Sequence, residues 1–280
     1  CHRVRGRGYR LPQTLDLLDP SALTDSLRDS GLHIELVDHT LSTSSDLLAR
    51  VDALASGHVR VAEWQTAGRG RQGRRWLSMP AQGLAFSVLW RFAGGVQALA
   101  GLSLAVAVAV ARACHDCGIA DVRVKWPNDL LLHHSQRGDR KLGGILVDVQ
   151  GDALGPSVAV IGVGLNVYAA PCDVGQPVAA LAEGAAGVIG RQQVLVATLE
   201  RLAEAIRTFE REGFEPFREP WQALHAWHLR SVEMQNADGS LTLGVATGID
   251  ASGALLLETP GGRVRVLSGD ISLRRTHVPE

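Results

Sequence analysis

The sequence has little cysteine, few aromatic residues and no excess charge of either sign. Of its 280 residues, four are cysteine and 5% are aromatic, and 28 Lys and Arg oppose 29 Asp and Glu for a net charge of −1. Near-neutrality argues against a general nucleic-acid coat or a membrane-surface protein, because both need a broad excess of basic charge. Sparse cysteine excludes a disulfide scaffold and is typical of a reducing compartment, so we expect a cytoplasmic protein.

Long apolar runs are also scarce. The longest, from Ala98 to Ala111, contains Ser103 and is shorter than the ~20 residues that span a bilayer. The first residues show no apolar core of a signal peptide, so we expect no membrane association. The chain begins at Cys1 instead of methionine, and the basic, glycine-containing segment 1–19 is expected to be the end of a larger N-terminal element.

Hydrophobic periodicity predicts an α+β chain followed by a small β-domain. Strands are expected at 34–38, 59–66, 84–92, 122–126, 143–150 and 157–167, and helices from 20, over 44–54 and 96–118, and within 191–229. Beyond residue 228, short strands separated by Asp-Gly and Pro-Gly-Gly turns are typical of a small antiparallel barrel. The expected domains are therefore 1–19, 20–228 and 229–280.

The segment Cys114 to Cys117 has the CxxC spacing of a redox or half-zinc motif. No second CxxC or HxxxH follows in the sequence to complete a zinc site. Because the pair ends an alanine-rich helical run, reduced and half-buried thiols are the favoured interpretation.

The most unusual segment is QTAGRGRQGRRW, Gln65 to Trp76, which concentrates arginine and glycine. Glycines let a backbone approach a ligand closely and adopt positive φ, as phosphate-binding loops require. Arg69, Arg71 and Arg74 offer paired donors for carboxylate or phosphate oxygens. A solvated basic loop and an RNA-binding Arg/Gly segment are the alternatives. The flanking apolar strands favour an anion-binding loop, since Arg/Gly nucleic-acid tails lie in disordered chain.

Later motifs place further polar groups at expected strand ends. In KWPNDL, Asn128 and Asp129 follow a proline and either hold Mg²⁺ through oxygen ligands or merely form a turn. In RKLGGILVD, Lys141 precedes a buried strand, which predicts an ammonium group near the end of the sheet. In GVGLNV, two glycines in a buried strand indicate the close approach of a ligand or of a helix.

The order and separation of five motifs resemble those of biotin protein ligases. The motifs are GRGRQGRRW, VKWPNDLLL, RKLGGILVD, GVGLNV and the terminal GDISLR. The opening VRGRGYRLPQTLDLL is similar to the wing and linker that follow the helix-turn-helix of the bifunctional repressor type. The resemblance implies a mixed-sheet, class II synthetase-like catalytic domain and a C-terminal SH3-like β-barrel. It also implies that biotin and ATP, with Mg²⁺, form biotinyl-5′-AMP, which biotinylates a lysine of a biotin carboxyl carrier protein.

The resemblance also implies a role for individual residues. Biotin is expected to contact Ser42, Thr43, Gln65, Gly68, Arg69, Arg71, Lys141, Gly144, Gly162, Gly164 and Leu165. ATP is expected to contact Arg74, Trp76, Asn128, Lys141, Asn166 and Arg274, with Asp129 as the metal ligand. Lys141 and Arg71 are the expected catalytic residues, because the family's lysine bridges the biotin carboxylate and the α-phosphate.

The sequence departs from the family pattern at a few positions. Ser44 stands where the family usually has asparagine, Gln72 replaces a frequent arginine, and the segment 133–138 is long. Lipoate ligase or octanoyltransferase chemistry and a non-catalytic, ligand-sensing repressor are the alternative functions. The missing RRxxGGGxVxH-like stretch disfavours the first, and Lys141 with its complete loop disfavours the second. Operator DNA is a partner only if the full protein carries a helix-turn-helix, and a homodimer is a further hypothesis from the resemblance.

Overall fold

A seven-stranded mixed sheet forms the centre of the protein, in the strand order β3-β4-β7-β11-β10-β9-β8. This computed structural model describes residues 2–4, 8–10, 14–172, 174–235, 240–267 and 272–275, with backbone alone at 2–4, 8–10 and 272–275. The strands are β3 (His33–Thr40), β4 (His58–Gln65), β7 (Gly83–Phe92), β8 (Val122–Lys125), β9 (Asp129–Leu132), β10 (Arg140–Gly151) and β11 (Ser157–Asn166). β3 and β4 run parallel, and every other neighbouring pair in this sheet is antiparallel.

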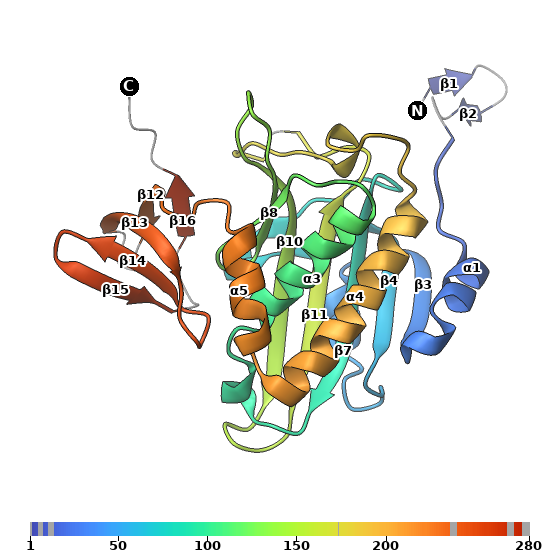
Figure 1. The fold of residues 1–280 in the computed structure, drawn as a ribbon. Helices are drawn as coiled ribbons and strands as arrows, with labels where there is room; N and C mark the ends of the chain where they lie inside the picture. The colour runs from blue at the N-terminus through green and yellow to red at the C-terminus, as the bar shows by residue number, and fades with distance from the viewer. Residues whose placement is uncertain are drawn as a thin grey trace.

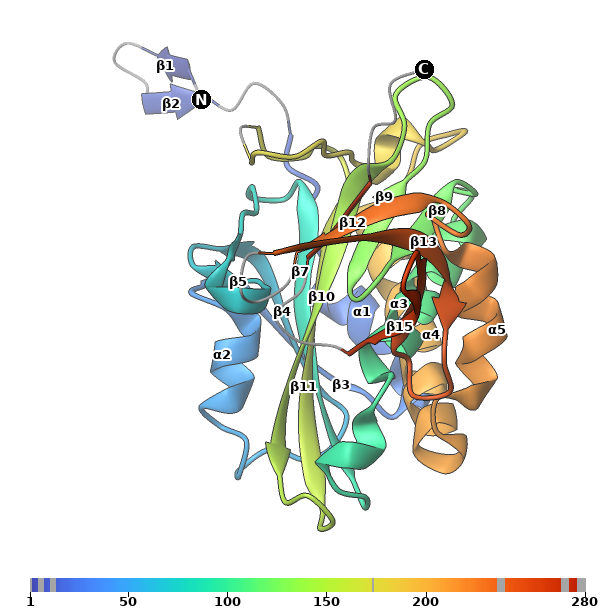
Figure 2. The same cartoon turned by 90° about the vertical axis from the view of Figure 1, so that its left-hand side faces the viewer.

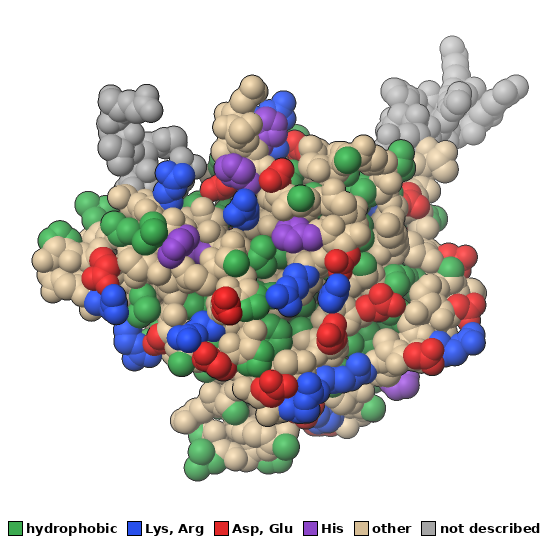
Figure 3. All heavy atoms as spheres, in the orientation of Figure 1, with side chains coloured by type: hydrophobic (Ala, Val, Ile, Leu, Met, Phe, Trp, Pro, Cys, Tyr) green, Lys and Arg blue, Asp and Glu red, His purple; other side chains and the backbone are tan. Residues whose placement is uncertain are grey.

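Three helices cover one face of this sheet (Figure 1): α3 (Leu102–Asp116), α4 (Arg191–Glu212) and α5 (Glu215–Leu224). α3 is apolar on nearly all sides because it packs against α4 and α5 as well as against the sheet. Acidic and basic side chains are intermingled on the outer surface of this helical layer (Figure 3), as near-zero net charge predicts.

The expected helix 96–118 is interrupted. A 3₁₀ turn, η3 (Val96–Leu99), is separated from α3 by Gly101, whose φ is 83°. A Cβ on this glycine would lie 2.5 Å from Cγ of Phe214, so tertiary packing also requires glycine here. By length and composition, Val96–Asp116 is the one segment of the described chain that could cross a membrane, yet 61% of its most apolar window is buried inside the protein. It is the core helix of the large domain.

The opposite face of the sheet is covered only in part (Figure 2), by α2 (Thr43–Leu48) and by the chain between β4 and β7. That connecting chain contains β5 (Gly68–Arg69), η2 (Arg71–Gly73) and β6 (Arg75–Trp76), so the expected loop is partly a two-stranded hairpin. α2 begins earlier than expected because Ser42 is its N-cap and accepts a hydrogen bond from Ser45 N at 3.4 Å, and it ends at Leu48, short of the expected end at Leu54.

The expected linker is held against the large domain by a buried ion pair. Nη2 of Arg191, whose side chain is 0% exposed, lies 2.7 Å from Oε2 of Glu63. Glu63 Oε1 accepts a hydrogen bond from Leu18 N at 2.6 Å, and Arg191 also donates to the carbonyl of Asp16. Upstream, β1 (His2–Val4) and β2 (Gly8–Arg10) pair as a hairpin. Downstream, Asp19 caps α1 (Pro20–Ser26), and η1 (Arg28–Ser30) leads into β3.

The C-terminal strands form a five-stranded antiparallel sheet in the order β15-β14-β13-β12-β16. They are β12 (Ser231–Gln235), β13 (Leu241–Ile249), β14 (Leu255–Thr259), β15 (Gly262–Val266) and β16 (Ser272–Arg275). Trp126 Nε1 donates to Gly253 O at 3.0 Å, which ties this small sheet to the large domain. The predicted α+β class, with a small C-terminal β-domain, is confirmed.

The two cysteines of the CxxC pair lie at the C-terminal end of α3. Burial raises the pKa of Cys114 to about 12, and burial with the Asp116 charge raises the pKa of Cys117. Among the described residues no three His, Cys, Asp or Glu side chains are grouped to hold a metal ion. Free, neutral thiols are the arrangement that this geometry supports.

Candidate active site

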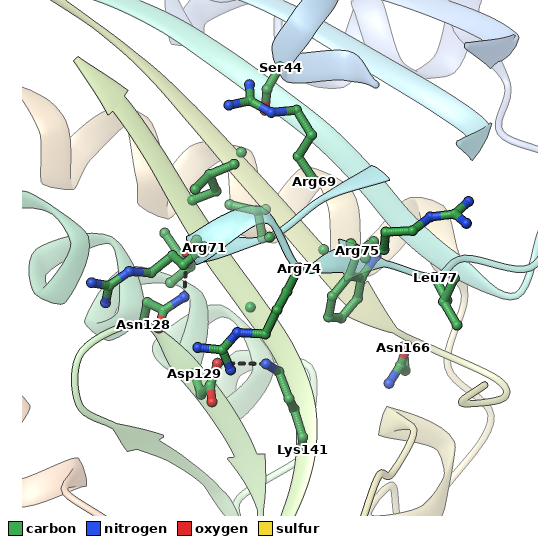
Figure 4. Close-up of a pocket in the computed structure, with 18 of the residues that line it drawn as sticks. Ser44, Arg69, Arg71, Arg74, Arg75, Leu77, Asn128, Asp129, Lys141 and Asn166 are labelled. Carbon is green, nitrogen blue, oxygen red and sulfur yellow. Dashed lines mark hydrogen bonds and ion pairs between the residues drawn. The ribbon is translucent and has the colours of Figure 1, made fainter. Parts of the chain in front are cut away.

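A cavity of about 500 Å³ opens on the face of the sheet that lacks α3, α4 and α5, beneath the Arg/Gly segment. Its lining includes most of the residues that the motifs single out (Figure 4). Those expected residues are Ser42, Thr43, Gln65, Arg69, Arg71, Arg74, Trp76, Asn128, Asp129, Lys141, Gly144, Gly162, Gly164 and Asn166. One compact site therefore collects motifs that are far apart in the sequence.

Glycines form the floor of the cavity. A Cβ on Gly164 would lie 2.4 Å from Cε2 of Trp76, and a Cβ on Gly162 would lie 2.6 Å from Oγ of Ser44. The groups that closely approach the glycines of GVGLNV are therefore side chains of the loop and of α2, and they lie on the cavity face of the sheet. Leu165 points to the opposite face, where it is 1% exposed in the helix-covered core, because side chains alternate along β11. Its predicted contact with biotin is not supported by this placement.

One end of the cavity is a buried network of neutral polar groups. Gln65 Oε1 accepts hydrogen bonds from Thr43 N at 2.7 Å and from Thr43 Oγ1 at 3.1 Å. Ser87 Oγ lies 2.7 Å from Thr43 Oγ1 and 2.9 Å from Ser44 Oγ. Ser87 does not line the cavity but supports Thr43 and Ser44, which do. The sequence analysis did not identify it, although a serine in the centre of the apolar strand 84–92 was a usable signal. This wall can recognise a neutral polar group by hydrogen bonds fixed in advance.

The other end of the cavity is cationic. Asp129 is 7% exposed, and its two oxygens lie 2.8 Å from Nζ of Lys125 and 2.8 Å from Nζ of Lys141. Burial alone would raise the pKa of Asp129, but the two ammonium groups more than offset it, so the pKa is lowered. Lys125 was missed as a site residue. Its spacing from Asp129 could have identified it, because the tight β8–β9 hairpin places these two positions opposite each other.

Asn128 forms the turn that KWPNDL predicts, and this turn lies at the wall of the cavity. The segment does reverse the chain between β8 and β9, and Asn128 Nδ2 donates to Ile145 O at 2.8 Å while Asn128 O accepts from Ile145 N at 2.9 Å. These bonds fix the turn to β10, so its side chains reach the cavity wall in a defined position. The turn itself is therefore part of the site.

A metal ion held by protein ligands alone does not fit this arrangement. Both oxygens of Asp129 already contact ammonium groups, and the described residues offer no cluster of three ligands. Mg²⁺ in nucleotide sites usually keeps waters and binds through one or two carboxylates with substrate phosphates. In this structure Asp129 is the partner of two lysines, and its role as a ligand of a phosphate-bound Mg²⁺ stays a prediction.

The arginines of the loop point in different directions. In Figure 4 the guanidinium groups of Arg71 and Arg74 extend toward the end of the cavity that holds Asn128 and Lys141, whereas that of Arg75 extends away. Arg74 Nη2 donates to Gln72 Oε1 at 2.7 Å, and Arg75 Nη2 donates to Thr66 O at 3.0 Å. Arg71 and Arg74 are therefore the loop cations placed to face an anion at the cationic end.

The remaining predicted residues have other positions. Gly68 pairs with Trp76 between β5 and β6, where a Cβ would lie 2.6 Å from Trp76 O, so it shapes the loop without lining the cavity. Asn166 lines the cavity and donates through Nδ2 to Ala179 O at 3.0 Å. The backbone of Arg274 pairs with Glu233, and its side chain lies outside the described part of the chain.

A glycine-floored cavity with one neutral polar end and one cationic end, on a mixed α+β sheet, defines a domain that binds a small, partly anionic ligand. Comparisons with known proteins identify the class. Residues 36–166 match the Biotin/lipoate A/B protein ligase family, and residues 230–274 match the Biotin protein ligase C terminal domain.

Individual relatives narrow the identification. The chain is 38% identical over 275 residues to the Bifunctional ligase/repressor BirA of Salmonella typhimurium, covering 97% of this chain and 83% of the relative. It is 34% identical over 263 residues to the Biotin--[acetyl-CoA-carboxylase] ligase of Mycobacterium tuberculosis, covering 91% and 95%. The structure of the Aquifex aeolicus biotin protein ligase in complex with biotin and ATP matches with a TM-score of 0.74 at 26% identity, covering 87% of this chain and 99% of the other. The chain therefore belongs to the biotin protein ligase family, and it is an enzyme.

Proposed function

We propose that the protein activates biotin with ATP as biotinyl-5′-AMP and then transfers biotin to a lysine of a carrier protein domain. The observation that best supports this proposal is that one cavity has a neutral, hydrogen-bonding end and an end that presents lysine and arginine. Biotin has a neutral polar head and an anionic carboxylate, so it fits these two ends in one orientation. The carboxylate then meets the nucleotide phosphates at the cationic end.

The first step requires two anions to approach each other. A carboxylate oxygen of biotin attacks the α-phosphorus of ATP, the bond to the β-phosphate oxygen breaks, and pyrophosphate leaves. Lys141 is proposed to neutralise charge on the carboxylate and the α-phosphate, and Arg71 and Arg74 to hold the phosphates from the loop side. Positioning and electrostatic stabilisation supply the rate enhancement of such a reaction, and no covalent enzyme nucleophile is needed.

Binding roles follow from the same orientation. Ser42, Thr43 and Gln65 are proposed to contact the polar head of biotin, and Gly144, Gly162 and Gly164 to admit its rings and chain. Trp76, Asn128 and Asn166 are proposed to contact the nucleotide. Gly68 is proposed to act through loop shape, and Leu165 through its backbone. Arg274 is retained as a nucleotide contact on the family resemblance alone.

The second step transfers biotin to an amine. The carrier lysine attacks the carbonyl carbon of the mixed anhydride, a C–N bond forms, and AMP departs. The name of the Mycobacterium tuberculosis relative specifies acetyl-CoA carboxylase as its target, which supports a biotin carboxyl carrier domain as the partner here. Mg²⁺ is proposed to arrive with ATP, bound mainly by the phosphates.

Further properties are proposed from the relatives. A cytoplasmic location agrees with the low cysteine content. The name of the Salmonella typhimurium relative includes repression. We propose operator binding only if the full protein has a helix-turn-helix before the β1–β2 hairpin. Formation of a homodimer is a separate proposal.

Biotin-dependent exchange of labelled pyrophosphate into ATP tests the first step, and mass-spectrometric detection of biotin on a carrier domain tests the second. Both are expected with biotin. Exchange supported by lipoate or octanoate in place of biotin would overturn the assignment. A protein that binds biotin and operator DNA but shows no exchange would instead be a non-catalytic repressor.

A further inference from the structure

We propose that Asp148 is a positioning residue that fastens the arginine-rich loop over the cavity through Arg69. Arg69 is then the anchor of the loop, and the contact with biotin expected for it from the sequence is replaced by a contact with protein. The kinetic part of this inference rests on the proposed function, because it concerns the retention of biotinyl-5′-AMP.

The ion pair has the geometry of a two-point attachment. Nη1 of Arg69 lies 3.1 Å from Oδ2 of Asp148, and Nη2 lies 3.2 Å from Oδ1. Both terminal nitrogens therefore face the same carboxylate in a parallel fork, which fixes the direction of the guanidinium plane as well as its distance. The side chains are 41% and 23% exposed, so the pair lies at the cavity rim, accessible to water.

Asp148 occupies a suitable place on the sheet. It lies on β10 at alternate positions from Gly144 and Leu146, which both line the cavity, so the three share one face of the strand. The loop leaves the sheet at the end of β4, and the strand order places β7 and β11 between β4 and β10. The Arg69–Asp148 pair thus closes the cavity across the width of two strands.

The short hairpin carries this attachment to the cations that face the cavity. Arg69 pairs with Arg75 between β5 and β6, and Gly70 N donates to Arg74 O at 2.7 Å. Arg71 and Arg74 lie within this hairpin, so fixing Arg69 limits where their guanidinium groups can point. Release of the anchor would remove one of the contacts that restrict the positions of these two side chains.

The kinetic test is the rate of release of biotinyl-5′-AMP from a preformed complex, followed by chase with unlabelled ligand. An exposed ion pair of this kind predicts about two- to five-fold faster release in Asp148→Asn. Asp152→Asn is the matched control, because Asp152 is an exposed carboxylate on the neighbouring β10–β11 turn. Its release rate is expected to equal that of the unchanged protein.

A double-mutant cycle separates an anchor from a ligand contact. If Arg69 acts through Asp148, Arg69→Gln and Asp148→Asn accelerate release equally, the double variant is no faster than either, and Arg69→Asp with Asp148→Arg restores retention. If Arg69 touches the ligand, Arg69→Gln accelerates release while Asp148→Asn does not, or the two effects add. Either of these results overturns the proposal.

A second measurement needs no ligand. Amide hydrogen exchange in the loop segment 68–76 of the ligand-free protein is expected to be faster in Asp148→Asn than in Asp152→Asn. Equal exchange would overturn the anchor even if adenylation is normal. Faster exchange in a protein that forms no biotinyl-5′-AMP would uphold the anchor and refute the proposed function, so the two failures are distinguishable.

Discussion

The Nζ atom of Lys141 lies 2.8 Å from Oδ1 of Asp129, and this contact holds the proposed catalytic cation at the wall of the cavity. A lysine side chain has a flexible four-carbon stem, so an isolated ammonium would sample many positions. The carboxylate limits that freedom. Lys125 contacts the other oxygen of the same carboxylate, so Asp129 positions two ammonium groups at once.

Replacement of Lys141 by alanine is expected to reduce biotin-dependent ATP–pyrophosphate exchange by about 100-fold or more. Removal of a preorganised group that stabilises transition-state charge typically costs about 10²–10³ in rate. Arg137→Ala is the control, because Arg137 is 66% exposed and its nearest carboxylate oxygen, on Glu183, is 3.6 Å away. Unchanged exchange in Lys141→Ala, with normal exchange in the control, would refute the assigned role.

Asp129→Asn distinguishes a partner of lysines from a metal ligand. As a partner of lysines, Asp129→Asn lowers the maximal exchange rate, because two cations lose their common anchor, while the Mg²⁺ concentration for half-maximal activity is unchanged. As a metal ligand, it shifts that concentration upward. Exchange measured against Mg²⁺ at saturating ATP separates the two, and a large upward shift would support the metal-ligand role expected from the sequence.

Gly164→Ala is expected to impair nucleotide binding. The new Cβ would lie 2.4 Å from Cε2 of Trp76, so the indole must move from the cavity floor. Overpacking usually costs about 1–3 kcal/mol. Because the indole can move, we expect a cost in the lower part of this range, which corresponds to roughly a ten-fold increase in the KM for ATP. Gly187→Ala is the control, since a Cβ there meets nothing within 4 Å. Equal KM values for both variants would contradict the assigned packing.

Glu63→Gln tests the buried pair that holds the linker. Arg191 would keep its charge in a fully buried position without an ionised partner, and the loss of one member of a buried pair costs about 3–5 kcal/mol. Asp116→Asn makes the same chemical change at an exposed pair with Arg201, where the side chains are 42% and 47% exposed, and is expected to cost less than about 1 kcal/mol. Denaturant unfolding measures both, and similar small effects would show that the buried pair does not stabilise the fold.

His225 is expected to make the folded state sensitive to acid. Burial, and then the nearby His228 charge, lowers the pKa of His225 from 6.5 to about 4. The unfolded chain therefore binds more protons between these values. The contribution of neutral His225 to stability is full above pH 6.5 and is lost as the pH falls from 6.5 to about 4, by about 3 kcal/mol in total. The ring is 4% exposed and stacks on Trp221 at 4.6 Å, which explains the cost of charging it.

The measurement is the free energy of unfolding at pH 7.5 and pH 5. His225→Gln should flatten this difference relative to the unchanged protein, whatever its effect at neutral pH. His39→Gln, at an exposed imidazole, should leave the difference as it was. An unaltered pH dependence in His225→Gln would show that another group carries the acid sensitivity.

Much of the local structure could be predicted because the signals are short in range. β-branched alternation located β4, and continuous apolar composition located β7 and α3. The interruption at Gly101 could not be predicted from that composition, since it depends on Phe214 packing against the glycine from over one hundred residues away. The side chain of Leu165 lies on the face opposite to the cavity, as strict alternation with Gly162 and Gly164 requires, so the biotin contact expected for it is not supported for its side chain.

The sequence by itself determined the class of the fold, the order of the motifs and most side chains that line the cavity, because residue types and spacing are local properties. Only the tertiary structure decided which charges are paired. Asp129 joins two lysines, and Asp148 meets an arginine that precedes it by 79 positions. The first set of partners follows from the neighbouring strands β10-β9-β8, and the second from the order β4-β7-β11-β10 and from where the loop crosses it. Electrostatic energy depends on distances of a few ångströms, and sequence separation does not supply those distances.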